Sequence, residues 1–356
     1  MARNKILYIG EKILSPQGGA EQINLRNQRL LEDLFPEMIS YVGETIKKPL
    51  KLHDKFYLGA SDKLIKDVVR EISTGCYKYA FISQSLWGRV AKTIKKTDPS
   101  ICIIAFFHNI EIQYAKEYCK ASGIKALPFY FAVKYWEKTT CCYSDKFITL
   151  NSRDSYLLKT IYNKKTDLEL PTSLEDRYCE SKKMQLEEKC KENIDYLFVG
   201  VAFFANIHGI QWFIDNVMPK VGGNLYIIGK GMEQVAFKNL NEKIHIKGFV
   251  EDLSYYYYNA KCVVSPIFLG GGMKTKTAEA LMYGKTIVGT TEAFRGYELD
   301  KRCTIVCNTP EEFEKAIKTD CPKFNHSSRE LFDKFYSLSS SKKILKRFFV
   351  NCENKD

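Results

Sequence analysis

The sequence lacks the features that define several classes of protein. No stretch approaches the ~20 consecutive apolar residues that a membrane span needs, and no signal-peptide pattern precedes the apolar run that begins at Lys5. No repeat of fixed period is visible either. These absences argue against a membrane-spanning or solenoid protein, and we expect a cytoplasmic one.

Zinc sites and disulfide frameworks are also missing. The 12 cysteines are scattered along the chain, and neither close pair, Cys141 with Cys142 or Cys303 with Cys307, is completed to a zinc spacing by a histidine or further cysteines. A chain of this length does not depend on a disulfide scaffold. We therefore expect buried or idle thiols.

Net charge narrows the kinds of partner. At +12, the chain could bind nucleic acid, an anionic membrane surface or anionic substrates. No DNA- or RNA-binding signature accompanies the charge, so nucleic acid is excluded from our expectations. An anionic membrane surface, at the inner face of a membrane, remains a predicted partner.

Length and patterning predict two α/β domains. A chain of 356 residues exceeds what one compact core usually supports. Short apolar runs alternate with helical segments in both halves, which is typical of parallel sheets. The expected strands are 5–10, 79–83, 101–107 and 147–150 in the first half, and 195–200, 225–229, 244–248 and 262–266 in the second.

The predicted domain boundaries follow from composition. We expect a first domain over residues 1–172, and a linker over 173–193, where Glu and Lys dominate without a core pattern. A second domain follows over 194–326. The tail, 327–356, has apolar residues at helical spacing.

One stretch, Ser265–Gly284, carries the strongest chemical signal. It predicts a strand, a turn of three glycines and a helix over 273–283 that stops at Gly284. Glycines let a backbone approach a ligand closely, and the N-terminus of a helix presents free N–H groups to an anion. A glycine loop at the carboxyl end of a parallel strand lies where α/β sheets bind ligands.

Three side chains on this helix fit a phosphorylated ligand. Lys274 and Lys276 fall in the first turn, where cations oppose the helix dipole unless an anion binds there. Glu279 lies three residues after Lys276 and therefore on the same helix face, where a carboxylate can accept hydrogen bonds from hydroxyls.

Together with its neighbours, this stretch resembles the group-one glycosyltransferases, retaining enzymes of the GT-B fold. That resemblance covers most of the chain and is specific over residues 196–289. It rests on Gly248-Phe-Val-Glu-Asp-Leu253, Ser265-Pro-Ile, Gly271-Gly-Met-Lys-Thr-Lys276, Glu279-Ala-Leu and Gly284-Lys-Thr-Ile-Val-Gly289.

The resemblance implies two Rossmann-like domains facing a cleft, a C-terminal helix that returns to the first domain, and a nucleotide-diphosphate sugar as donor. Glu279 would bind the ribose hydroxyls, and Lys274, Lys276 and the loop amides would stabilise the leaving diphosphate. The implied donor-binding residues, besides the catalytic Lys276 and Glu279, are Phe249, Val250, Gly271, Gly272, Met273, Lys274 and Thr275.

In the first domain, the resemblance points to one histidine and one loop. His108 follows the apolar run 101–107, at the carboxyl end of a predicted central strand. From the sequence alone, a structural role is the commoner one for such a histidine. The family places a histidine here beside the transferred sugar, and Gly18 and Gly19 occupy the place of its donor-contacting glycines.

Two departures from the family pattern are visible. Gly271 replaces the first of two glutamates that many members carry, so the donor sugar cannot be read. Residues 200–206 contain no cation where the family usually has two, and we expect Lys274 to compensate. No Asp-x-Asp motif is placed to hold a divalent ion, so we expect metal independence and no cofactor beyond the nucleotide sugar.

The predicted activity is transfer of sugar, with retention, to a glycan or lipid-linked acceptor in bacterial cell-surface polysaccharide synthesis. The alternatives are a nucleotide-sugar epimerase of the same fold and a catalytically inert GT-B subunit. The aromatic segment 126–138 also has two interpretations. It is either a buried helix of the first domain, or a helix that places aromatic side chains in a lipid headgroup layer.

Overall fold

The computed structural model describes residues 5–10, 19–36, 39–43, 56–270, 272–319 and 321–353. The chain divides into two compact units. One comprises the residues up to Pro171 together with those from Lys342 onward, and the other runs from Thr172 to Ser341.

The first unit contains a six-stranded sheet in which all pairings are parallel, in the order β2-β1-β3-β4-β5-β6. Its strands are mostly continuous apolar runs, as expected where helices cover both faces of a sheet. They are β1 (Lys5–Ile9), β2 (Ile39–Val42), β3 (Tyr77–Ile82), β4 (Cys102–Phe107), β5 (Lys146–Thr149) and β6 (Leu168–Glu169).

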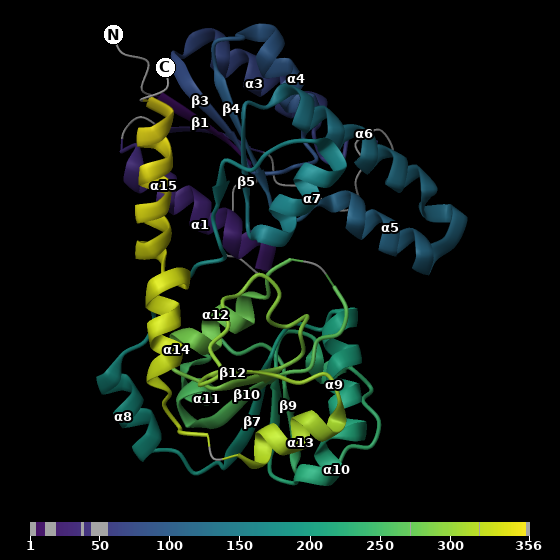
Figure 1. Cartoon of the computed structure of the whole chain (residues 1–356), viewed down its shortest axis with the longest axis vertical. Coiled ribbons are helices and arrows are strands. Elements are labelled where there is room, and N and C mark those ends of the chain that lie inside the picture. Colours follow the sequence, from purple (N-terminus) through teal and green to yellow (C-terminus); the bar gives the residue numbers. More distant parts are fainter. Residues whose placement is uncertain are drawn as a thin grey trace. The chain divides into compact units, whose positions relative to one another are not determined.

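Helices cover this sheet on both faces (Figure 1). Alternate strand residues such as Leu7, Ala80 and Ile103 pack in one buried cluster with α3 and α4. The side chain of Phe106 lies on the opposite face of the sheet, where Arg26 of α1 is placed over its ring. The helices are α1 (Gly19–Leu34), α3 (Asp62–Thr74), α4 (Gly88–Thr97), α5 (Glu111–Ser122), α6 (Leu127–Tyr143) and α7 (Ser152–Tyr162), with a 3-10 turn, η1 (Gly123–Ala126), between α5 and α6.

The second unit has its own six-stranded parallel sheet, in the order β12-β11-β10-β7-β8-β9. The strands are β7 (Ile194–Val199), β8 (Leu225–Ile228), β9 (Ile244–Lys247), β10 (Ala260–Ser265), β11 (Ile287–Gly289) and β12 (Thr304–Val306). Its helices are α8 (Glu180–Glu188), α9 (Phe204–Asn216), α10 (Met218–Val221), α11 (Ser254–Asn259), α12 (Thr275–Met282), α13 (Pro310–Lys318) and α14 (His326–Leu331), with a 3-10 turn, η2 (Met232–Gln234).

The core of this unit joins the sheet to α9, α10 and α13. Phe198, Ile227 and Val264 of the strands and Phe213 and Phe313 of the helices are all buried in one cluster. Gly209 lets α9 approach the end of β10, because a Cβ there would lie 2.0 Å from the carbonyl oxygen of Pro266. Close packing at this point fixes the start of the glycine loop.

These two sheets confirm the prediction of an α/β protein with two parallel-sheet domains. Residues 173–193, which we predicted as a linker, include α8 and lie within the second unit. None of the described helices is long and apolar enough to cross a membrane.

The C-terminal tail is helical over most of its length. After α14 comes a π-helical turn, Phe332–Tyr336, and then α15 (Leu338–Glu353). The part of α15 from Lys342 onward belongs to the first unit. Lys342 forms an ion pair with Asp33, and Phe349 packs edge-on against Phe35 and Tyr79.

Candidate functional site

The glycine loop of the second unit lies at a topological switch point. Within this sheet, β7 is the first strand, and it pairs with β8 on one side and with β10 on the other. The chain direction across the sheet therefore reverses between β7 and β10. In open parallel sheets, ligands bind at the carboxyl ends of the strands at such a point, and here these ends lead into Gly200 and into the loop before α12.

The loop reaches α12 through glycines in backbone conformations that other residues rarely adopt. Gly270 has φ +110° and Gly272 has φ +68°. Gly271, which we predicted as donor-binding, lies outside the described residues. Helix α12 begins at Thr275 after an extended Lys274, whose side chain makes no capping hydrogen bond. Its first amide groups are therefore suited to an anion.

Lys274 takes part in a buried ionic cluster. Its Nζ lies 2.7 Å from Oε1 of Glu292 and donates to the carbonyl oxygen of Gly272 at 2.9 Å. The other carboxylate oxygen of Glu292 lies 2.5 Å from Nη2 of Arg295. Lys274 thus ties the glycine loop to the segment after β11, which holds the loop in place.

Lys276 extends to the loop after β7. Its Nζ donates to Oδ1 of Asn206 at 2.7 Å and lies 4.1 Å from the centre of the Phe198 ring. A Cβ on Gly200 would lie 2.8 Å from the same ammonium group. We expected Lys274 to supply the positive charge that residues 200–206 lack, but the structure places the ammonium group of Lys276 against these residues.

Burial weakens the charge of Lys276. It lowers the pKa of the ammonium group from 10.5 to about 7, with repulsion from Lys274 as a smaller cause and the carboxylate of Glu279 opposing both. No carboxylate is hydrogen-bonded to this ammonium group in the described residues. A bound anion would restore the ordinary pKa.

Glu279 lies one turn further along α12. Its Oε2 accepts a hydrogen bond from the hydroxyl group of Tyr257 at 2.9 Å. Burial raises the pKa of Glu279, while the Tyr257 hydrogen bond and the charges of Arg177 and Lys276 oppose this shift. The carboxylate is held in place by a neutral donor and keeps lone pairs for further hydroxyl groups.

The other predicted donor-binding residues surround this helix start or the next strand end. Met273 is buried and Thr275 is the first residue of α12. Phe249 and Val250 follow β9, and the side chain of Phe249 is 74% exposed. An aromatic side chain so exposed at a strand end offers a flat apolar surface to a ring.

His108 follows β4 at the carboxyl edge of the first sheet. Its Nε2 lies 2.8 Å from Oδ1 of Asn24 on α1 and 3.0 Å from the carbonyl oxygen of Ser83 after β3. Both partners are acceptors, so Nε2 carries the proton and donates. Its Nδ1 is buried and has no partner among the described residues, which leaves a lone pair free to accept a hydrogen bond.

We expect His108 to remain neutral at physiological pH. Burial lowers its pKa from 6.5 to about 4, with the charge of Arg26 adding to the shift. The ring signals of His108 in an NMR titration, identified by their loss in His108→Gln, should then stay constant from about pH 5 to 8. An inflection near pH 6.5 would contradict the structure. Because the unfolded chain takes up this proton below pH 6.5, the shift lowers the free energy of unfolding as the pH falls toward 4.

The predicted glycine pair of the first domain is only partly described. Gly18 lies outside the described residues, and Gly19 is the first residue of α1. The same helix carries Asn24, the partner of His108.

Sequence reasoning missed four residues that position the site in the second unit. Asn206 and Glu292 hold the two lysines, Tyr257 holds Glu279, and Arg177 contributes charge near Glu279. The sequence did contain one signal, because Glu292 and Arg295 stand three residues apart shortly after the run 286–289, which contains β11.

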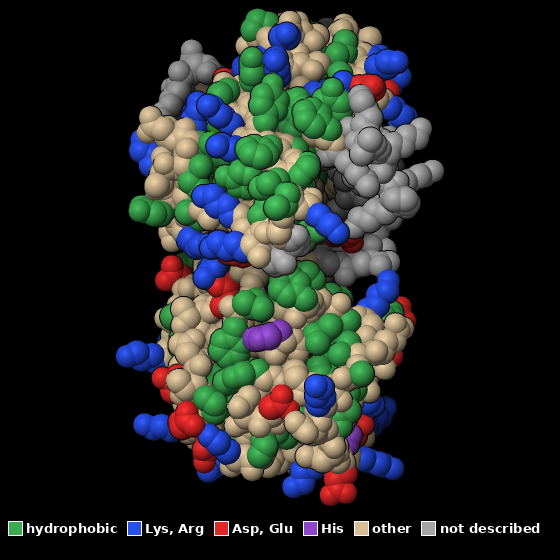
Figure 2. Space-filling view, turned by 90° about the vertical axis from the view of Figure 1, so that its right-hand side faces the viewer, with side chains coloured by type: hydrophobic (Ala, Val, Ile, Leu, Met, Phe, Trp, Pro, Cys, Tyr) green, Lys and Arg blue, Asp and Glu red, His purple; other side chains and the backbone are tan. Residues whose placement is uncertain are grey.

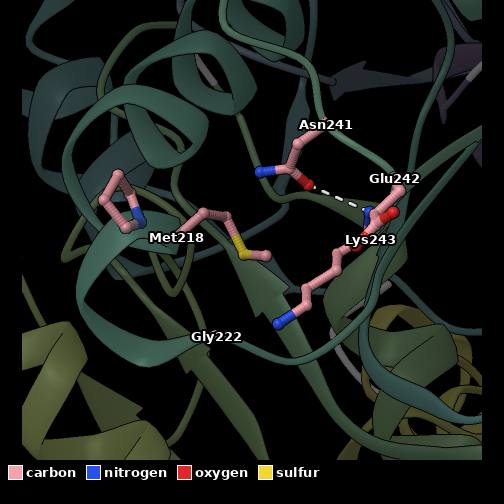
Figure 3. Close-up of a pocket in the computed structure, with 6 residues that line it drawn as sticks. Met218, Gly222, Asn241, Glu242 and Lys243 are labelled. Carbon is pink, nitrogen blue, oxygen red and sulfur yellow. Dashed lines mark hydrogen bonds between the residues drawn. The ribbon is translucent and has the colours of Figure 1, made fainter.

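A pocket also lies at the other edge of the same sheet (Figure 3). It is formed where β8 and β9 begin, and it contains none of the predicted site residues. Its lining consists of Met218, Pro219, Gly222, Asn241, Glu242 and Lys243.

Two parallel-sheet units, with the chemical groups at the carboxyl edges of their strands, define an α/β protein of the GT-B fold. Residues 193–319 match the family model described as glycosyl transferases group 1. This match confirms the predicted resemblance over residues 193–319. No curated protein sequence matches it.

Solved structures with a similar fold match nearly the whole length of this chain. Sucrose-phosphate synthase from Thermosynechococcus elongatus is 14% identical with a TM-score of 0.73, over 99% of this chain and 100% of that one. HepE from Anabaena in complex with UDP is 13% identical with a TM-score of 0.67, over 98% and 100%. The lipopolysaccharide outer core galactosyltransferase WaaB is 12% identical with a TM-score of 0.65, over 98% and 99%.

Proposed function

We propose that the protein is a glycosyltransferase that transfers a sugar, with retention of anomeric configuration, from a nucleotide-diphosphate sugar to a glycan or lipid-linked acceptor. The observation that carries the proposal is the arrangement around α12. The N-terminus of a helix that its N-cap side chain leaves uncapped, an ammonium group bonded to no carboxylate of the described residues, and a tethered carboxylate all meet at the switch point of the second sheet. HepE, which shares the fold, has been solved with UDP and with UDP-glucose.

In this proposal the donor nucleotide binds to the second unit. Glu279 accepts hydrogen bonds from the ribose hydroxyls, and the ring and backbone of Phe249 and the backbone of Val250 contact the base. The diphosphate lies against the amide groups that begin α12. Lys276 donates to it and becomes fully protonated, so its charge is strongest when negative charge grows on the leaving group.

His108 in the first unit serves the sugar and its acceptor. As a neutral imidazole that donates through Nε2 to Asn24 and Ser83, it has one fixed orientation. Nδ1 then accepts a hydrogen bond from a sugar hydroxyl. Retention and the role in bacterial cell-surface polysaccharide synthesis rest on the family resemblance.

A panel of nucleotide sugars tests donor binding first. A ligand that binds only the folded chain raises its unfolding temperature, by an amount that depends on concentration and Kd. The panel should show stabilisation by UDP or another nucleoside diphosphate, and more by the cognate sugar nucleotide. A panel without any shift would contradict the proposal.

Product analysis with the selected donor then separates the possible activities. We expect free nucleoside diphosphate only when an acceptor is supplied, and NMR of the product should show the anomeric configuration of the donor. Conversion of the donor alone would indicate an epimerase. Binding without either reaction would indicate an inert subunit.

We also expect metal independence. In the described residues no group of three or more His, Cys, Asp or Glu side chains is clustered as a metal would need, and Lys276 with the α12 amide groups supplies positive charge for the diphosphate. Chelation with EDTA should therefore change the transfer rate by less than ~twofold, since no divalent ion takes part in leaving-group stabilisation. A loss of activity that added Mg²⁺ or Mn²⁺ restores would contradict this prediction.

A further inference from the structure

The hairpin of α5, η1 and α6 exposes an apolar surface that the proposed chemistry does not use. On α6, Leu127, Phe131 and Tyr135 recur every four residues along one face, and they are 40%, 60% and 53% exposed. On α5, Tyr114 and Tyr118 are also exposed, and their rings stack 6.3 Å apart. We call these residues, together with Ile124 of η1, the hairpin surface.

The exposed face of α6 is distinct from its packing face. Ala132, Val133, Trp136 and Glu137 are buried, and Val133 belongs to a core cluster that also includes residues of β4 and α5. One face of the segment 126–138 is therefore buried as predicted, while another face leaves aromatic side chains exposed. The exposed aromatic residues are not needed to fill the core.

The hairpin surface is rich in positive charge. Lysines are exposed along both helices and at the tip, and no described residue forms an ion pair with any of them. Of the three glutamates on the hairpin, only Glu117 is exposed, since Glu137 is buried and Glu111 partly so. In Figure 2, green apolar side chains gather with blue lysine and arginine side chains on the half of the molecule that carries this hairpin. The lysines are Lys116, Lys120, Lys125, Lys134 and Lys138.

From this combination we infer that the hairpin surface docks the protein on an anionic lipid bilayer. Ile124, which is 83% exposed, and the aromatic rings would enter the headgroup layer, where Tyr and Phe side chains are favourable. The five lysines would lie against anionic headgroups, which attract basic residues close to the surface. A protein partner fits less well, because protein interfaces are depleted of lysine.

Flotation of the full-length chain with vesicles tests this inference. At low salt, the protein should float with vesicles that contain phosphatidylglycerol and remain unbound with vesicles of phosphatidylcholine alone. Absence of flotation with anionic vesicles would overturn the inference. The assay needs no donor, so its failure and a failure of the proposed sugar transfer are distinguishable.

Matched variants locate the contact. Lys134→Glu with Lys138→Glu should weaken binding to anionic vesicles at least ~tenfold, and Phe131→Ser with Tyr135→Ser should weaken it to a similar extent. The control, Lys66→Glu with Lys315→Glu, makes the same change of charge at exposed helix positions elsewhere. It should retain at least half of the wild-type binding.

Two results would assign the surface otherwise. An equal loss of binding in both pairs of charge variants would show attraction by net charge rather than docking through the hairpin. Self-association of the wild type without lipid, lost in Phe131→Ser with Tyr135→Ser, would assign the surface to a second copy of the chain. Unchanged unfolding temperatures would show that the variants fold.

Discussion

Replacing Lys276 with Ala should lower kcat at least ~tenfold and raise the KM for the donor. The ammonium group of Lys276 is held by Asn206 over the ring of Phe198, at the end of β7. In the proposed mechanism its interaction with the leaving diphosphate grows as the glycosidic bond breaks, so the loss should fall on the transition state more than on the bound donor. Steady-state kinetics with the donor selected from the nucleotide-sugar panel measure both constants.

Two other variants make the result specific. Lys276→Arg keeps a cation in place and should retain more activity than Ala. Lys243→Ala removes an exposed lysine at the opposite edge of the same sheet (Figure 3) and should leave both constants within ~twofold. Wild-type turnover in Lys276→Ala would remove this residue from the mechanism.

The same lysine predicts a pH dependence of nucleotide binding. Its pKa is about 7 in the free protein, and a bound diphosphate raises that value because the charged form is then paired. Binding of UDP should therefore take up a proton above pH 7, and the affinity should fall as the pH rises from there. A terminal phosphate is already almost fully ionised in this range. Lys276→Arg, which stays charged, should flatten the curve in a calorimetric titration.

Replacing Glu137 with Ala should destabilise the first unit by about 3–5 kcal/mol, because it leaves several buried donors unpaired. The carboxylate of Glu137 accepts hydrogen bonds from the amides of Glu111 and Ile112 at 2.8 and 3.1 Å. It also accepts from the hydroxyls of Ser85 at 3.2 Å and Tyr162 at 2.6 Å. The N-cap residue of α5, Ile110, makes no side-chain capping hydrogen bond. The start of α5 is therefore stabilised by Glu137, which lies 26 residues after Glu111 in the sequence.

The thermal unfolding temperature of the first unit measures this loss. We expect a decrease of at least ~6 °C in Glu137→Ala, together with faster hydrogen exchange at the amides of Glu111 and Ile112. Glu117→Ala, at an exposed position on α5, should change stability by less than ~0.5 kcal/mol. Equal unfolding temperatures for Glu137→Ala and the wild type would show that the four hydrogen bonds are not needed.

Much of the fold could be predicted from the sequence because parallel strands are continuous apolar runs. The run at 101–107 became β4, and the run at 195–200 became β7 with a shift of one residue. The helix predicted over 273–283 is α12, which starts two residues later because Lys274 is extended. Helix α8 was missed, since its residues 180–188 carry no apolar face for the pattern to reveal and none of them is buried.

The site was harder to predict than the fold. Sequence spacing placed Lys274 and Lys276 at the start of one helix, and that was sufficient to propose an anion site. It could not show that they contact different loops, because Glu292 and Asn206 lie 18 and 70 residues away along the chain. For the same reason, the hydrogen bonds that orient His108 became visible only when Asn24 and Ser83 were brought beside it. The burial that lowers its pKa likewise depends on residues distant in the sequence.

The central claim is that a nucleoside diphosphate binds at the start of α12, and a crystal structure of the complex with UDP tests it most directly. We expect both phosphate groups within hydrogen-bonding distance of the amide groups that begin α12 and of Nζ of Lys276, with the ribose on Glu279. A diphosphate bound anywhere else on the protein, with Lys276 still paired only with Asn206, would contradict the account.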